Sequence, residues 1–371
     1  MTRREEHQTK HRRVVEYMES HALDAVVLAQ RPNFAWYTAG GLNHVGTADS
    51  TGIAALLITR EWTICLTNNI EAPRLADEEL ADLDIEVKAA SWFDEGALKR
   101  LWLAEVGGLR TACDVPFPAL PGGVCCLDTD FATLRWVMTE GEIRRYRILA
   151  RDVAECLEVA CGQAEPGMTE FGLAARIAQT ALAKGIRTPV LLVAADDRIR
   201  HYRHPIPTGR VFERYGMGVL GGERHGLTVS VTRLFSFGPI DPELRRKHEA
   251  VCRIDAAMMA ATRPGKAMGE VLAVAQEVYA QQGFTDEWTF HHQGGLTGYL
   301  GREIRVAPGC LIAIQGHQVF AWNPSIAGTK SEDTLLVGPG RNEILSLTGG
   351  WPTMPFAVQG QQYCRCCVRE L

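Results

Sequence analysis

The sequence predicts an α+β protein of two domains, a smaller α/β domain over residues 1–135 and a larger, internally duplicated domain over residues 136–371. Three observations support this prediction. The chain of 371 residues is longer than one ordinary domain needs. Short apolar runs alternate with helical patterns in the first part, and a helix–helix–strand pattern occurs twice in the second part.

In the first domain, apolar runs predict strands at 25–29, 53–59 and 63–67, the last two forming a hairpin. A stretch rich in Glu, Leu and Ala predicts a helix over 69–83. Three prolines and two glycines within 116–123 break regular structure, so we expect a linker near 125–138.

In the second domain, apolar residues at helical spacing predict helices over 142–161 and 169–184, with Thr169 as N-cap and Gly185 as a stop. The same pattern then recurs. Glu243 opens the second unit as Glu142 opens the first, and Pro166-Gly167 recurs as Pro264-Gly265. A strand-rich stretch follows each helix pair. We therefore expect repeats at about 139–240 and 241–340, with a ligand site between them.

The composition argues against several classes of partner. The net charge of −5 provides no basic surface for nucleic acid or an anionic membrane. No apolar run approaches the ~18 residues of a membrane span, and the charged N-terminus does not resemble a secretory signal. We expect a cytoplasmic protein that binds a small polar molecule or a short peptide-like substrate.

The 11 cysteines include two adjacent pairs and no spaced framework, which favours free thiols in a reducing compartment. Cys364, Cys366 and Cys367 lie near the C-terminus without the paired spacing of a zinc site. We expect them to belong to a mobile tail.

Several motifs in order carry a resemblance to a known family. They are the segment from Thr139 to Arg145, Glu-Pro-Gly-Met-Thr-Glu at 165–170, and Thr-Lys-Ser-Glu-Asp-Thr at 329–334. The chain resembles the creatinase, aminopeptidase P and prolidase family (M24), whose catalytic domain has the "pita-bread" fold. The N-terminal domain is similar to the creatinase-type domain, including the segment 33–41 around Trp36. The resemblance implies a homodimer in which the N-terminal domain of one subunit reaches the active site of the other. Trp36 is then either a core residue of its own domain or part of the partner's site.

Metal-dependent members of this family bind two metal ions with two Asp, one His and two Glu. On the positions that match, this chain carries Val219 and Ser230 for the aspartates, Gly295 for the histidine, and Gln315 and Glu332 for the glutamates. One carboxylate cannot hold a dinuclear centre of hard cations. We therefore expect no metal and no other cofactor.

The remaining polar residues suggest a metal-free site. A histidine is suited to proton transfer near neutral pH, and the resemblance implies glutamates that grip a cationic substrate. The candidates for catalysis are His204, His292, His317 and Glu332. The candidates for substrate binding are His201, His291, Arg233, Arg302, Glu303, Gln315, Tyr299 and Trp36.

These candidates also have simpler interpretations. Adjacent His291 and His292 on a strand would point to opposite faces, so only one would face the pocket, whereas His317 would share a strand face with Gln315. Arg233 and Arg302 could form salt bridges or clamp a substrate carboxylate. A single metal held by several histidines is conceivable, although no helical His-Glu-x-x-His motif is present.

The function that these residues favour is cleavage or rearrangement of a C–N or amide-type bond in a small polar molecule, without a metal. Two alternatives stay open. One is a metal-dependent Xaa-Pro peptidase with relocated ligands, and the other is a catalytically silent binding module on the same fold.

Overall fold

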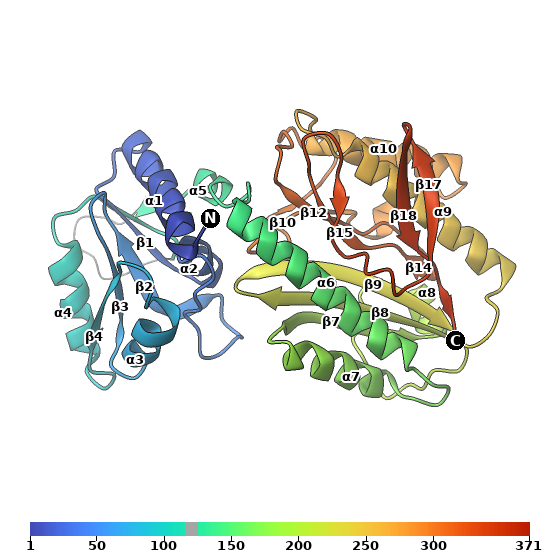
Figure 1. The fold of residues 1–371 in the computed structure, drawn as a ribbon, viewed down its shortest axis with the longest axis horizontal. Coiled ribbons are helices and arrows are strands. Elements are labelled where there is room, and N and C mark those ends of the chain that lie inside the picture. Colours follow the sequence, from blue (N-terminus) through green and yellow to red (C-terminus); the bar gives the residue numbers. More distant parts are fainter. Residues whose placement is uncertain (116–124) are drawn as a thin grey trace. The chain divides into compact units, whose positions relative to one another are not determined.

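The structure is a computed structural model that describes residues 1–115 and 125–371 (Figure 1). The chain divides into two compact units. The first contains residues 1–135, 139–142 and 225–227, and the second contains the other described residues. The prolines and glycines expected to mark the boundary at 116–123 lie outside the described residues. Among the residues that the structure describes, no helix is long and apolar enough to span a bilayer.

The first unit is built on a six-stranded sheet with the order β4-β3-β2-β1-β5-β6. Strand β2 is antiparallel to β1 and β3, whereas the outer pairs are parallel. The elements are α1 (Arg3–Ser20), β1 (Ala25–Gln30), α2 (Arg31–Tyr37), β2 (Thr51–Ile58), β3 (Thr63–Asn68), α3 (Ala72–Arg74), a π-helical turn (Leu75–Glu79), β4 (Glu86–Ala90), α4 (Glu95–Val106), β5 (Thr111–Cys113), β6 (Cys125–Cys126) and α5 (Thr129–Thr133).

The three predicted strands of this unit are confirmed by β1, β2 and β3. The predicted helix over 69–83 is confirmed only in part, because the helical segment is shorter and consists of α3, which continues directly as the π-helical turn. The Asn68 side chain accepts from two backbone N–H groups of the next turn, and Pro73 lies in the first turn of α3, where a proline is tolerated, so the helical segment starts later than predicted. The expected linker over 125–138 instead contains β6 and α5, which Asp128 caps.

The second unit contains two helix pairs, each followed by a mainly antiparallel sheet, as the repeated pattern predicts (Figure 1). The first half consists of α6 (Glu140–Gly162), α7 (Glu170–Ala183), β7 (Arg187–Ala195), α8 (Asp197–His201), β8 (Tyr215–Arg224) and β9 (Leu227–Ser236). The second half consists of α9 (Pro242–Ala261), α10 (Met268–Gln281), a 3-10 turn (Glu287–Phe290), β10 (Gly294–Thr297), β11 (Ile304–Arg305), β12 (Val319–Trp322), β13 (Ser325–Ile326), β14 (Thr329–Lys330), β15 (Asp333–Leu336), β16 (Glu343–Ile344), β17 (Thr353–Val358), β18 (Gln361–Cys366) and β19 (Arg369–Glu370).

Helices α6 and α7 pack closely on strand β8, because glycines leave room for them. A Cβ on Gly218 would lie 2.9 Å from Leu157 of α6, and one on Gly222 would lie 2.4 Å from Val153. The Thr169 side chain caps α7 by accepting from the N–H of Gly172, which confirms the predicted N-cap. The first sheet has the order β19-β9-β8-β7 and the second β11-β10-β12-β15-β16.

A buried ionic network fixes the C-terminal strands in the second unit. Asp333 accepts from Arg233 at 3.1 Å and from Arg365 at 2.6 Å. Arg233 also donates to Glu158, and Arg365 also pairs with Asp255. Both guanidinium groups are fully buried. The prediction of a mobile C-terminal tail is therefore wrong, because residues 361–366 form β18, which carries Arg365 into the core.

We predict that Asp333→Asn lowers the free energy of unfolding by about 3–5 kcal/mol, because it leaves two buried guanidinium groups without their shared carboxylate. Urea unfolding followed by tryptophan fluorescence measures this change. The control is Glu243→Gln, which removes an exposed, solvent-screened pair with Arg246 and should change the stability far less than Asp333→Asn does. Equal effects of the two substitutions would contradict the assigned role of Asp333.

A second prediction concerns His248, a buried residue of α9. Its ring contacts Thr329 Oγ1 at 2.8 Å and the carbonyl of Cys366 at 2.9 Å, and burial lowers its pKa to about 4. Between pH 6.5 and pH 4 the unfolded chain therefore binds a proton at His248 that the folded chain does not bind. The stability contributed by neutral His248 is complete above the unfolded pKa of ~6.5 and is lost as the pH falls towards 4.

Between pH 7.5 and pH 5 this loss amounts to about 2 kcal/mol. The stability difference between the natural chain and His248→Gln should therefore shrink by about that amount over this interval, as measured by urea unfolding at both pH values. A difference that does not change with pH would show that His248 does not stay neutral in the fold.

Candidate active site

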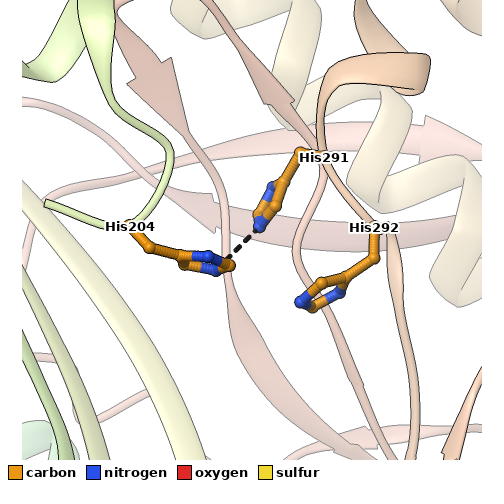
Figure 2. A group of neighbouring side chains, drawn as sticks. All are labelled: His204, His291 and His292. Carbon is orange, nitrogen blue, oxygen red and sulfur yellow. Dashed lines mark hydrogen bonds between the residues drawn. The ribbon is translucent and has the colours of Figure 1, made fainter.

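Three histidines of the second unit converge on one point (Figure 2). His204 follows α8, and His291 and His292 immediately precede β10. One ring nitrogen from each lies within 4.8 Å of the others, and the Nε2 atoms of His204 and His291 are 3.2 Å apart. His204 is exposed, His292 is half-buried and His291 is buried, so the cluster opens to solvent on the side of His204.

The prediction that only one of His291 and His292 faces the site is wrong. It assumed a strand with alternating side chains, but β10 begins only at Gly294. Residues 291–293 form an irregular segment in which the two rings lie 4.7 Å apart. The Nδ1 atom of His292 accepts from the N–H of Gly294, and Nδ1 of His291 lies 3.0 Å from Ser325 Oγ.

A buried carboxylate with cationic partners is electrostatically coupled to this cluster. Glu332 Oε1 accepts from Arg302 at 3.1 Å, and Glu332 Oε2 lies 2.8 Å from Lys330 Nζ and accepts from the Thr232 hydroxyl at 2.7 Å. Burial alone would raise the pKa of Glu332, but Lys330 and Arg302 outweigh it and lower the pKa to about 2. Glu332 is therefore a fully paired anion at neutral pH.

Burial first, and then nearby cations, lower the pKa values of the three histidines. Partial burial, and then the charge of Lys330, lowers the pKa of His204. Burial holds the pKa of His291 far below its usual range, with a further contribution from Lys330. Burial and the nearby Arg302 and Arg305 lower the pKa of His292 to about 4. Lys330, Arg302 and Arg305 all act on the cluster as positive charges, of which Lys330 and Arg302 are paired with Glu332.

The structure also tests whether these residues fit the dinuclear metal centre that the family implies. At Gly295, which the resemblance matches to the liganding histidine, a Cβ would lie only 2.1 Å from the carbonyl oxygen of Ile304, with φ at +149°. Val219 lies in an apolar core cluster, and Ser230 accepts from Arg302. Glu332 has protein partners on both oxygens. The residues do not fit a dinuclear centre.

Several other sequence candidates lie elsewhere. Arg233 is fully buried in the network with Asp333 and Glu158, so it is a structural residue and not a substrate clamp. Trp36 is fully buried in the first unit and offers no surface to a substrate. His201, at the end of α8, lines a separate cavity with Arg198 and Tyr202.

His317 does not share a strand face with Gln315. It lies in a turn with φ at +63°, because the chain reverses there before β12. Both side chains are exposed, and His317 does not belong to the histidine cluster. Tyr299 is buried, and Glu303 accepts from the N–H groups of Tyr299 and Leu300, which closes the loop before β11.

Sequence reasoning missed Lys330, Arg305 and Ser325. Lys330 could have been found, since it stands two residues before Glu332 and residues at this spacing share one face of an extended chain. Arg305 pairs in register with Gly295 across β10 and β11, and this register is not evident from the sequence. Ser325 reaches His291 from β13, 34 residues away.

Comparison with known proteins agrees with this fold. A probable dipeptidase PepE from Mycobacterium bovis is 25% identical over 370 residues, covering 86% of this chain and 94% of that protein. A structure of an Xaa-Pro dipeptidase from Bacillus anthracis has a TM-score of 0.75 at 16% identity, covering 92% of this chain and 97% of the other. These relatives have the two-domain pita-bread architecture expected from the sequence.

The N-terminal domain of FACT complex subunit SPT16 from Cicer arietinum (chickpea) has a TM-score of 0.71 at 12% identity, covering 93% of this chain and 97% of the other. The fold is therefore shared by proteins with different names and roles. The sequence profile described as metallopeptidase family M24 matches residues 144–339, more than half of the chain. The chain thus belongs to metallopeptidase family M24.

Proposed function

We propose that this protein is a cytoplasmic hydrolase that cleaves an amide or other C–N bond of a small polar or peptide-like substrate without a metal ion. The observation that carries the proposal is the pairing of Glu332. At the only matched position that keeps a carboxylate, both oxygens are bound by Arg302, Lys330 and Thr232. Two cationic side chains therefore neutralise the carboxylate on a position that, by the resemblance, matches a metal ligand of the family.

The positive charge has a chemical use. Hydrolysis of an amide places negative charge on the carbonyl oxygen in the transition state, and fixed cations in a partly buried site stabilise that charge. Lys330 and Arg302 are already oriented by Glu332, so they need little reorganisation. Glu332 is then a positioning residue, because its two oxygens are no longer free to grip a cationic substrate.

The histidines supply proton transfer. His204 is exposed and can reach a bound substrate, whereas His291 is buried and is held by Ser325. One imidazole accepts a proton from the attacking water, and the same proton can pass to the leaving nitrogen. The contact of 3.2 Å between the two Nε2 atoms orients His204 for this role.

The surroundings also favour a substrate with an anionic group. Three cations, Lys330, Arg302 and Arg305, act on the histidines, and Glu332 balances only part of their charge. A free carboxylate, as at the end of a short peptide, would meet favourable electrostatics near Arg305.

One observation favours a second candidate, a binding module without catalysis. The likeness to the SPT16 domain, which is named as a subunit of a complex, is nearly as close as the likeness to a dipeptidase. Binding of a carboxylate-bearing ligand without turnover would support this alternative.

The main test is a panel of dipeptides, N-acyl amino acids and small cyclic amides, followed by mass spectrometry, with the metal content of the protein measured in parallel. We expect hydrolysis of at least one carboxylate-bearing compound in the presence of EDTA. Activity that appears only after addition of Mn²⁺, Co²⁺ or Zn²⁺ would overturn the proposal in favour of a metallopeptidase.

We predict that Lys330→Met lowers kcat by about 10²–10³-fold, because it removes one of the fixed charges that stabilise the transition state. Lys266→Met is the matched control, since Lys266 also lies 2.8 Å from a glutamate oxygen, that of Glu270, but on the exposed surface just before α10. Turnover by Lys330→Met at the level of the control would count against the electrostatic role.

His204→Ala should lower kcat by about 10²–10⁴-fold while circular dichroism shows an unchanged fold, because the exposed imidazole carries the proton. Steady-state kinetics on the substrate found in the panel measures the change. A variant that loses affinity but keeps kcat would show that His204 binds the substrate without transferring a proton.

A further inference from the structure

We infer that Arg203 and Glu287 are positioning residues, whose ion pair holds the His204 ring against His291. The Arg203 guanidinium donates to Glu287 Oε2, and the two side chains are only 18% and 22% exposed. The placement of His204 by this pair can be tested without a substrate. Its consequence for catalysis rests on the proposed function, in which His204 transfers the proton.

His204 lies in an irregular segment after α8, so its position depends on the contacts of the residues beside it. Some of these contacts lead back to the first half of the second unit, where the Ile206 carbonyl accepts from the Arg198 side chain at 2.9 Å. Arg203 instead reaches Glu287, which is 84 residues away in the second half. The Arg203 side chain therefore connects the segment of His204 to the half of the unit that contains the rest of the cluster.

Glu287 joins three segments of the second unit at one carboxylate oxygen. It begins the 3-10 turn that ends at Phe290, just before His291. Its Oε2 atom accepts from Arg203 and, at 3.1 Å, from the N–H of Ala327 in the turn between β13 and β14. Because the acceptor is ionised, these hydrogen bonds are stronger than neutral ones. The three segments are thus fixed relative to one another at this oxygen.

The same three segments meet again at the His291 ring (Figure 2). Its Nε2 atom lies 3.2 Å from Nε2 of His204, and its Nδ1 atom lies 3.0 Å from Ser325 Oγ. His204 follows Arg203 directly, and Ser325 stands two residues before Ala327. Each segment therefore supplies one residue to the ion-paired carboxylate and one residue to the ring contacts.

The ion pair is the stronger of these two connections. Burial lowers the pKa values of His204 and His291, so their contact joins two neutral rings, and water competes for the exposed ring of His204. Hydrogen bonds between ionised groups are roughly twice as strong as neutral ones. The low exposure of Arg203 and Glu287 also limits screening by salt. The pair therefore determines where His204 lies.

The other side of the cluster is held independently by Tyr279 of α10. The Tyr279 hydroxyl accepts from the N–H of Ser325 at 2.9 Å and donates to Gln293 Oε1 at 2.9 Å. The Gln293 amide in turn donates to the carbonyl of His291 at 2.6 Å. Loss of the ion pair should therefore release His204 while His291 stays in place.

The first experiment needs no substrate and uses nuclear magnetic resonance of the full-length protein with ¹⁵N-labelled histidine side chains. His204→Ala should shift the ring signals of His291 in the natural chain, because it removes the 3.2 Å contact. In a chain that carries Arg203→Gln or Glu287→Gln, His204→Ala should leave these signals unmoved, because the ring has already left. A shift of the same size in all backgrounds, or no shift in the natural chain, overturns the inference.

The second experiment measures kcat and KM on a substrate found in the panel described above. Arg203→Gln and Glu287→Gln should each lower kcat by about 10–100-fold, because a small misplacement of a catalytic group slows the reaction. KM should change by less than about 3-fold, since the cations near Glu332 are untouched. The double variant should lose no more than the worse single variant, because both substitutions break one interaction.

The matched control is Arg187→Gln, which breaks an ion pair with Glu223 of similar exposure at the end of β7 that lies farthest from α8. It should keep the natural kcat. An unchanged kcat in Glu287→Gln, or an equal loss in the control, overturns the inference. A panel without any hydrolysis would reject the proposed function and leave the inference to be decided by the ring signals of His291.

Discussion

The pairing of one buried carboxylate with two cations determines the chemistry open to this protein. Glu332 connects Thr232 of β9, Lys330 of β14 and Arg302 of the loop before β11, so it joins both halves of the second unit. Each of these charges would be costly to bury alone, and together they compensate one another. Both oxygens of the carboxylate are thereby occupied by protein partners, and its two cations act electrostatically on the histidine cluster.

The next residue in the chain has the same charge and a different role. Asp333 binds Arg233 and Arg365 in the core, where no solvent reaches them. Because successive side chains of an extended segment point to opposite sides, Glu332 and Asp333 serve the site and the core respectively. The two arginines differ in the same way, because Arg302 pairs with Glu332 and Arg233 pairs with Asp333. The sequence presents both as candidate clamps, but Arg233 lies on the side of the core.

Local patterns were sufficient to predict much of the fold and part of the site. The apolar runs predicted β1, β2 and β3, and Thr169 predicted the start of α7, because these elements depend on neighbours in the sequence. The residues Val219, Ser230, Gly295 and Gln315 led to the expectation that the chain lacks a dinuclear centre, and this expectation stays a prediction. The convergence of His291 and His292 could not be predicted, because it depends on the point at which β10 begins. The turn at His317 and the contact from Ser325 likewise depend on tertiary structure.

The fold of family M24 persists here although most of its metal ligands are replaced, since those positions do not hold the fold together. Val219 packs in a core cluster where an aspartate would need a cation, and Gly295 lets β11 approach β10 where a side chain would collide with Ile304. Both replacements are compatible with close packing of the strands. Glu332 is the exception, because a buried carboxylate always needs positive charge nearby. In this chain Lys330 and Arg302 provide that charge, so the carboxylate is kept in a stable core, and under the proposed function the same two cations serve the reaction.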